Sequence, residues 1–161
     1  MNRTSEYDFT VVVPIYNESA NMEKLETAFR DYLAAASRPT CVLFVNDGSS
    51  DDSLQGIRTL CERVAHCYYI SFARNAGLSA AIKAGIDCVG SPLVGYIDAD
   101  LQTTPEDFEL LLPYTADFAL VTGVRANRKD TGFKRFQSRF ANGFRRMMTH
   151  DDATDTGWPL K

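Results

Sequence analysis

Residues 9–18 read Phe-Thr-Val-Val-Val-Pro-Ile-Tyr-Asn-Glu. The first six are mostly apolar, rich in β-branched side chains and end at a proline, a pattern that predicts a short buried β-strand. Apolar runs of similar length follow at residues 40–45, 67–72, 93–97 and 118–122. Between them, apolar residues recur at helical spacing, and this alternation predicts an α/β fold with a mostly parallel sheet and helices on both faces.

Two of the intervening helices have a clear apolar face. In the helix after the first strand, this face consists of Met22, Leu25, Phe29 and Leu33. In the helix after the third strand, it consists of Leu78, Ile82, Ile86 and Val89. Because the apolar faces of surface helices usually pack on the protein core, both sets are expected to face the sheet.

The composition is that of an ordinary globular protein, with 161 residues, of which 45% are hydrophobic and 24% charged. It excludes a disordered chain, a collagen-like repeat and a coiled coil. Residues 1–161 are expected to form a single domain, and a chain with no long apolar run or signal-like start is expected in the cytosol.

The net charge of −4 is unevenly distributed. Residues 124–146 contain eight basic side chains and one acidic side chain, whereas residues 1–123 are strongly acidic. A basic segment beside an acidic body suggests a surface for anions, phosphates above all. The acidic body and the lack of a recognised motif argue against nucleic acid as the partner.

In a parallel sheet, ligands bind beyond the carboxyl ends of the strands. All five segments at these ends are rich in polar residues; they are residues 14–18, 46–49, 73–77, 98–102 and 123–125. Asp98 and Asp100 stand two residues apart, so both carboxylates can point the same way and offer Mg²⁺ or Mn²⁺ the oxygen ligands that these ions prefer. The alternative for such a pair is a solvated acidic turn or a helix cap. Glycine-rich dinucleotide, P-loop and nucleophile-elbow motifs are absent from the sequence.

Together these segments resemble the family 2 glycosyltransferases. The resemblance rests on Val12–Glu18, Val45–Asp51, Arg74–Gly77, Asp98–Gln102 and Gly123–Arg125. The sequence Asp-Ala-Asp-Leu-Gln at residues 98–102 is most similar to the polyprenyl-phosphate hexosyltransferases, such as dolichol-phosphate mannose synthase. The resemblance implies a GT-A fold, which is Rossmann-like, and an inverting hexosyltransferase that uses a GDP- or UDP-sugar, Mg²⁺ or Mn²⁺, and a polyprenyl phosphate acceptor.

Carried over residue by residue, the resemblance assigns Pro14, Tyr16 and Glu18 to the base and ribose pocket and Asp47 to the base. It places Asp98, Ala99, Asp100 and Gln102 around the diphosphate, with Asp98, Asp100 and Gln102 holding the metal. Arg125 and Arg135 would contact phosphate, and Asp155 lies in a motif near the reacting centre. Asp100, Arg125 and Asp155 are therefore the expected catalytic residues. Arg74 is expected either to contact the nucleotide or to pair with Asp47 or Asp98 for stability.

Two departures from the family pattern stand out. Asn46 occupies a position where the family commonly has aspartate, so it can form hydrogen bonds but carries no charge. The chain also stops at Lys161, short of a usual member, and is expected to be a catalytic-domain fragment truncated at its carboxyl end.

The sequence leaves several alternatives open. The acceptor could be a saccharide hydroxyl, as in the synthesis of cell-surface polysaccharides, in which case Asp155 is the first candidate for the general base. The chain could also be a non-catalytic module that binds nucleotide sugars. A full-length lipid-phosphate transferase is expected at the cytosolic face of a membrane, and the sequence leaves a homo-oligomer open.

Overall fold

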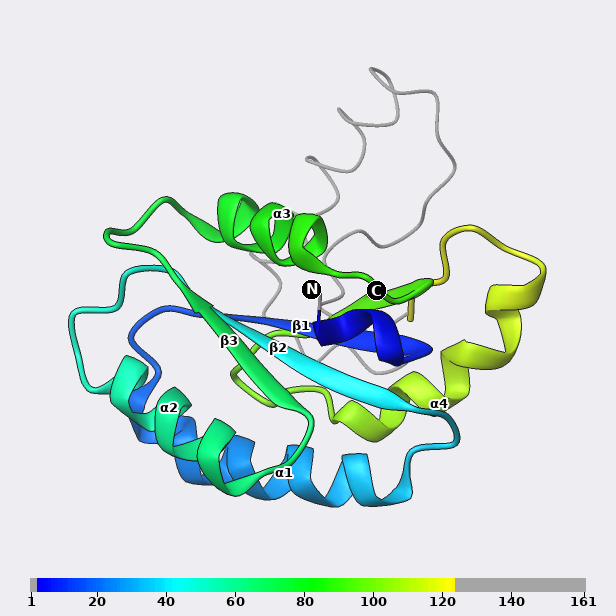
Figure 1. The fold of residues 1–161 in the computed structure, drawn as a ribbon, viewed down its shortest axis with the longest axis horizontal. Helices are drawn as coiled ribbons and strands as arrows, with labels where there is room; N and C mark the ends of the chain where they lie inside the picture. Colours follow the sequence, from blue (N-terminus) through cyan, green and yellow to red (C-terminus); the bar gives the residue numbers. More distant parts are fainter. Residues whose placement is uncertain (1–2, 124–161) are drawn as a thin grey trace, which may run out of the picture. The chain divides into compact units, whose positions relative to one another are not determined.

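The computed structural model describes residues 3–123, which fold around a four-stranded parallel sheet (Figure 1). The strands are β1 (Phe9–Ile15), β2 (Thr40–Asn46), β3 (Cys67–Ser71) and β4 (Leu93–Tyr96), in the spatial order β3-β2-β1-β4. Every residue of β1 and β2 is buried, as expected for strands covered on both faces. The predicted parallel α/β architecture is confirmed.

Helices cover both faces of this sheet (Figure 1). Helices α1 (Met22–Ala35) and α2 (Ser53–Arg63) lie on one face, and α3 (Leu78–Cys88) lies on the other. The chain also forms α4 (Phe108–Leu111) and four short 3-10 helices, η1 (Arg3–Glu6), η2 (Ser19–Asn21), η3 (Pro105–Asp107) and η4 (Leu112–Ala116).

Alternating residues of the central strands supply the two halves of the core. Phe44 of β2 meets Phe29 of α1 edge to face, with ring centroids 5.5 Å apart. Its neighbours in sequence, Leu43 and Val45, face the other way and form a cluster with Val12 and Ala81. Such alternation is the normal consequence of strand geometry, and it places α1 and α3 on opposite sides of β2.

The prediction for α1 is largely confirmed, and that for α3 is wrong for Leu78 and Ile86, whereas Val89 packs against the core as expected. Helix α1 buries Met22, Leu25 and Phe29 as expected, with Tyr32 buried rather than Leu33. Helix α3 instead turns its small residues, Ala81 and Gly85, toward the sheet. Large apolar residues of α3 point outward; Leu78 is 52% exposed and Ile86 is 45% exposed.

Close packing explains this difference in α3. A Cβ atom added to Gly85 would lie 2.4 Å from Cγ1 of Val12, so no larger residue fits between helix and strand at this point. Small residues four positions apart therefore let α3 approach the sheet closely. Glycine and alanine contribute little to an apolar pattern, so the periodicity of the large residues assigned Leu78 and Ile86 to the core and missed Ala81 and Gly85.

The fifth strand expected at residues 118–122 does not form. This segment lines a cavity together with Leu93, Val94 and Gly95 of β4, but it makes no ladder with that strand. Phe118 and Leu120 are 60% and 74% exposed, so the segment lacks the burial that a run of apolar residues needs to hold a strand in place. Within residues 3–123, β4 is thus an edge strand.

A carboxylate at the start of α2 links this helix to η2. Asp51 accepts hydrogen bonds from the backbone N–H groups of Ser19 (3.1 Å) and Ser53 (3.0 Å). Desolvation on its own would raise the pKa of Asp51, but the hydrogen bonds with Ser53 and Ser19 outweigh it and lower the pKa to about 2.

This lowered pKa predicts how acid affects stability. A depressed carboxyl pKa contributes stability that is present above the ordinary value and is lost as pH falls toward about 2. We expect Asp51→Asn to flatten the loss of stability between pH 4 and pH 2 in urea titrations. The effect should be below about 1 kcal/mol because Asp51 is exposed and screened by solvent. An unchanged acid limb would contradict this expectation.

Residues up to Val121 belong to one compact unit. That all 161 residues form one domain stays a prediction, because residues 124–161 lie outside the described part of the chain. Among residues 3–123, no helix has the length and hydropathy needed to cross a bilayer.

Candidate functional site

The order of the strands creates a switch point beside β1. The chain runs from β1 to β2 and β3 on one side and then returns to place β4 on the other side of β1. The loops that leave β1 and β4 therefore diverge, and a crevice opens between them at the carboxyl ends of the strands. Residues 16–18 follow β1 and residues 98–100 closely follow β4, so both polar segments reach this crevice.

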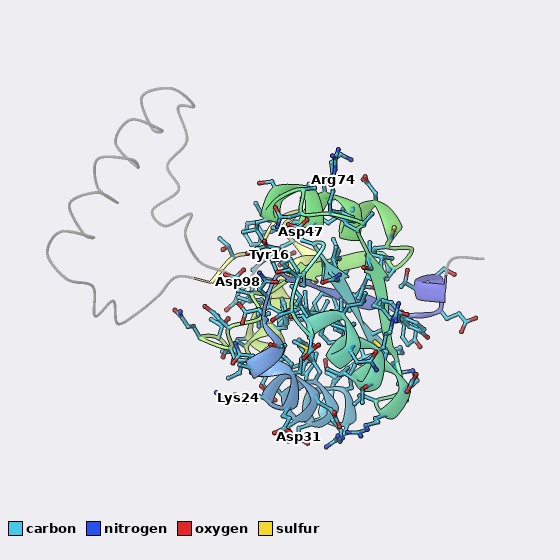
Figure 2. All side chains as sticks on the ribbon, turned by 90° about the vertical axis from the view of Figure 1, so that its left-hand side faces the viewer. Tyr16, Lys24, Asp31, Asp47, Arg74 and Asp98 are labelled. Carbon is cyan, nitrogen blue, oxygen red and sulfur yellow. The ribbon has the colours of Figure 1, made fainter. Side chains whose placement is uncertain are left out.

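A cleft of about 280 Å³ occupies this place. Its lining residues are Pro14, Ile15, Tyr16, Glu18, Asp47, Asn75, Gly77, Leu78, Ala81, Asp98, Ala99 and Asp100. Figure 2 shows Tyr16, Asp47 and Asp98 close together in projection, at the end of the molecule that these strand ends form. A larger cavity of about 780 Å³ flanks β3 but contains neither member of the Asp98–Asp100 pair.

The loop after β1 is held in place by hydrogen bonds to the start of α2. Asn17 donates its backbone N–H to Oγ of Ser49, and Glu18 donates its own to Oγ of Ser53, at 3.0 Å and 2.8 Å. Between β1 and these anchors, the side chain of Tyr16 remains 48% exposed at the cleft. An exposed aromatic ring on a fixed loop is suited to packing against a planar base or a sugar.

The acidic pair lies on the opposite side of the crevice. Ala99 is buried and its neighbours Asp98 and Asp100 both line the cleft, as the two-residue spacing predicted. Asp98 accepts a hydrogen bond from the hydroxyl of Tyr96, and Asp100 accepts one from the backbone N–H of Gln102 at 3.1 Å. Burial, then the bond to Asp98, raises the pKa of Tyr96, so this hydroxyl keeps its proton and continues to donate.

This pair fits a divalent cation. Two carboxylates at one cleft provide the hard oxygen ligands that Mg²⁺ and Mn²⁺ prefer. Within residues 3–123, no third His, Cys, Asp or Glu completes a cluster, so the remaining ligands would come from a bound phosphate or from water. The Gln102 side chain is not part of the cleft lining, and its assignment to the metal stays a prediction.

Asp47 directly follows β2 and accepts hydrogen bonds from the loop between β3 and α3. It is only 3% exposed and accepts three hydrogen bonds from residues 75–77. Asn46 beside it is equally buried: its amide donates to Oγ of Ser71 (2.9 Å) and its carbonyl oxygen accepts from the backbone N–H of Ser49 (3.3 Å). An uncharged side chain therefore satisfies both neighbours where the family commonly has an aspartate.

Other predicted site residues are placed elsewhere. Arg74 is exposed, projects away from the cleft (Figure 2), and forms no ion pair with Asp47 or Asp98 among the described residues. Arg125, Arg135 and Asp155 lie outside the described part of the chain, so their roles stay predictions.

Five lining residues were not assigned to the site from the sequence; they are Ile15, Asn75, Gly77, Leu78 and Ala81. Asn75 and Gly77 lie in a strand-end segment that the rule for parallel sheets nominates, so this signal was available. Leu78 and Ala81 were not assigned to the site because the sequence analysis treated their helix, α3, only as a structural element.

The fold is thus an open, parallel α/β sheet whose expected ligand site, at the switch point, contains an acidic pair. Residues 10–158 match the family described as Glycosyl transferase family 2. The chain belongs to this family, and the GT-A fold that the sequence predicted is confirmed.

One curated relative is the undecaprenyl-phosphate 4-deoxy-4-formamido-L-arabinose transferase of Serratia proteamaculans, which is 32% identical over 94% of this chain and 47% of its own length. The chain thus spans about half the length of the curated relatives it matches.

Solved structures show the same fold. The mannosyltransferase of Pyrobaculum calidifontis, in complex with GDP-Man and Mn²⁺, has a TM-score of 0.58 and 22% identity over 69% of this chain and 33% of its own. TarS of S. aureus in complex with UDP-GlcNAc has a TM-score of 0.56 and 17% identity over 77% of this chain and 37% of its own.

Proposed function

We propose that the full-length protein is an inverting glycosyltransferase that moves a sugar from a nucleoside diphosphate sugar to a polyprenyl phosphate. The observation that carries this proposal is the cleft where Asp98 and Asp100, which follow β4, lie beside Pro14 near the end of β1 and Tyr16 directly after it. The undecaprenyl-phosphate transferases that the chain resembles support the acceptor class.

Charge in the cleft supports a metal-dependent donor site. Glu18, Asp47, Asp98 and Asp100 line it, and no Lys or Arg does so among the described residues. All charged side chains that the described residues place in the cleft are therefore negative, and a divalent cation on Asp98 and Asp100 would supply the positive charge that a diphosphate needs. Such a cation stabilises the charge that develops on a leaving diphosphate. The basic residues of segment 124–146 are further candidates for contact with phosphate.

The residues around this cleft have distinct proposed roles. Tyr16 and Pro14 would bind the base and ribose, while Asp98 and Asp100 would hold the metal and thereby orient the diphosphate. Tyr96 would keep the Asp98 carboxylate in position through its hydrogen bond. A polyprenyl phosphate is already an anion at neutral pH, so its attack on the anomeric carbon requires no strong general base.

Several finer points belong to the same proposal. Transfer of a hexose, the choice between GDP and UDP, and a place at the cytosolic face of a membrane are proposed from the resemblance. The related transferases are named for an undecaprenyl-phosphate acceptor, and a lipid acceptor brings the enzyme to a membrane surface.

Calorimetric titration of UDP, GDP and CDP, with and without Mn²⁺, tests the donor site. We expect one diphosphate to bind and its affinity to fall at least tenfold without the metal, because the cleft lining alone repels phosphate. Asp31→Asn, on the solvent side of α1 and far from the cleft (Figure 2), is the matched control and should bind normally. Binding that is indifferent to the metal would contradict the proposed site.

An acceptor assay then tests the reaction. The full-length protein is supplied with the nucleotide sugar identified by titration and with either undecaprenyl phosphate or an oligosaccharide. Transfer to the lipid phosphate alone supports the proposal. Transfer to the saccharide alone would overturn the acceptor, and absence of transfer to both, with intact donor binding, would favour a binding module.

A further inference from the structure

Strand β3 forms one edge of the sheet, with β2 as its neighbour (Figure 1). At one end of this pairing, the carbonyl oxygen of His66 accepts from the N–H of Val42; at the other, the N–H of Phe72 donates to the carbonyl oxygen of Asn46. Because the backbone groups of successive residues point to opposite sides of a strand, residues 68 and 70 also bond to β2. The residues between them face away from it.

These outward-facing residues are Cys67, Tyr69 and Ser71. Their N–H and C=O groups form no backbone hydrogen bond within residues 3–123. A free edge is a template for another strand, and proteins commonly guard it with charged residues or proline. Strand β3 reads Cys-Tyr-Tyr-Ile-Ser and contains neither. The opposite edge, β4, shares a cavity with residues 118–121, so β3 is the more open of the two edges.

The surface beside this edge carries an exposed aromatic ring and two opposite charges. Tyr68 and Ile70 pack on the α3 side of the sheet, so the ring of Tyr69, which is 40% exposed, lies on the α2 side. It lines a cavity of about 780 Å³ together with Arg58 and Glu62, one helical turn apart on α2. Both charges are exposed, and neither forms an ion pair among the described residues.

A two-fold axis through Tyr69 would pair this edge with a second copy of itself. In an antiparallel ladder, opposite residues whose backbone groups face each other exchange two hydrogen bonds. With Tyr69 opposite itself, Cys67 lies opposite Ser71 of the second copy, and all three outward-facing residues gain a partner. An axis through residue 68 or 70 would leave one of the three unpaired.

The same axis brings opposite charges together. It reverses the direction of α2 in the second copy, so the order from Arg58 to Glu62 along one helix runs beside the order from Glu62 to Arg58 along the other. Both residues share a cavity with Tyr69, the residue on the axis. Arg58 of each copy would therefore lie near Glu62 of the second copy, which makes the patch self-complementary, as a symmetric dimer requires.

We propose that the chain forms a symmetric dimer through β3, with Tyr69 on the two-fold axis and one sheet continuing through both copies. This interface lies on the far side of β2 from the crevice between β1 and β4, and it requires no bound nucleotide. The inference therefore goes beyond the proposed function and does not depend on it. Strand β3 has only five residues, so we expect a weak, concentration-dependent association.

Sedimentation equilibrium of the 161-residue chain, over roughly a hundredfold range of concentration, tests the association. We expect the mean mass to rise from the monomer value toward that of a dimer. Tyr69→Pro removes an N–H that β2 does not use, so the strand keeps its bonds to β2 while the second copy loses two. Association should weaken by roughly tenfold or more. Tyr69→Lys, which places like charges on the axis without constraining the backbone, should give the same result.

The opposite edge supplies the matched control. The N–H groups of Leu93 and Ile97 donate to Asp8 and Val12, so the N–H of Val94 faces away from β1 just as that of Tyr69 faces away from β2. Val94→Pro should leave association unchanged.

Charge exchange and hydrogen exchange test the register. Arg58→Glu sets like charges against each other and should weaken association, whereas the double variant that adds Glu62→Arg should restore it. Backbone amides of residues 67, 69 and 71 should exchange more slowly as protein concentration rises. Those of residues 68 and 70, already bonded to β2, should not respond.

Several results would overturn the inference. They are a chain that stays monomeric at the highest concentration, equal weakening by Tyr69→Pro and Val94→Pro, and an association that Arg58→Glu leaves unchanged or that the charge exchange does not restore. Slow exchange at residues 67, 69 and 71 at every concentration would also overturn it, because the edge would then be covered within a single chain.

Discussion

Replacing Asp100 with alanine is expected to lower turnover of the full-length enzyme by roughly 10²–10³-fold, the scale seen when one preorganised electrostatic contact is removed. Asp100 lines the cleft beside Asp98, and its exposed carboxylate is positioned to hold the cation that neutralises a leaving diphosphate. Among the described residues, its carboxylate accepts a hydrogen bond from the backbone N–H of Gln102, which is only two residues away. Stability should therefore change by less than about 0.5 kcal/mol, because the substitution is on the surface.

Two measurements separate this effect from a folding defect. Thermal unfolding of Asp100→Ala should match that of the unaltered chain, and Asp31→Asn should retain full activity. The variant should also lose most of the increase in diphosphate affinity that Mn²⁺ provides. If turnover fell while the Mn²⁺ dependence of binding stayed intact, Asp100 would not be a metal ligand, and the chemical role proposed for the acidic pair would be wrong.

Replacing Gly48 with alanine is expected to cause the second large effect, a loss of about 2–4 kcal/mol in the free energy of unfolding. A left-handed backbone conformation costs alanine about 1–2 kcal/mol, and Gly48 adopts such a conformation with a φ of +62°. The added Cβ would also lie 2.3 Å from a backbone carbon of Arg74, which cannot rotate aside as a flexible side chain would. Urea titration measures the loss.

Gly77→Ala shows the effect of backbone strain without a contact. Gly77 also has a positive φ, +93°, but its added Cβ would meet nothing within 4 Å. This variant introduces backbone strain alone, and we expect it to lose about 1–3 kcal/mol, because a φ of +93° with a ψ of 156° is a conformation almost exclusive to glycine. A loss in Gly48→Ala no larger than about 2 kcal/mol, which left-handed strain alone would cause, would show that contact with the 74–75 peptide contributes little.

Local patterns were sufficient for four of the five expected strands and for the ligand-binding edge. The apolar run at residues 9–14 follows from burial, and the polar residues after each strand follow from sheet geometry. Both causes leave a local pattern in a single sequence. The sequence also placed Pro14, Tyr16, Glu18, Asp47 and the segment 98–100 among site residues, and the structure brings all of them to one cleft.

Interactions between segments far apart in the sequence could not be predicted from such local patterns. The inward face of α3 is set by the space beside Val12, which admits only Ala81 and Gly85. The partners of Asp47 lie in another loop, and nothing near Asp47 in the sequence indicates that its carboxylate is occupied. Residues 118–122 have the composition of a strand, but no strand within residues 3–123 pairs with them.

Pairing of the first strand with the fourth has a consequence for synthesis on the ribosome. Phe9 pairs with Leu93, so most of the described chain must be made before β4 can align with β1 and the acidic pair can face Tyr16. A nascent chain that ends before Asp100 has no complete cleft. Capture of a nucleoside diphosphate by arrested chains of increasing length would therefore report the moment at which this long-range pairing closes.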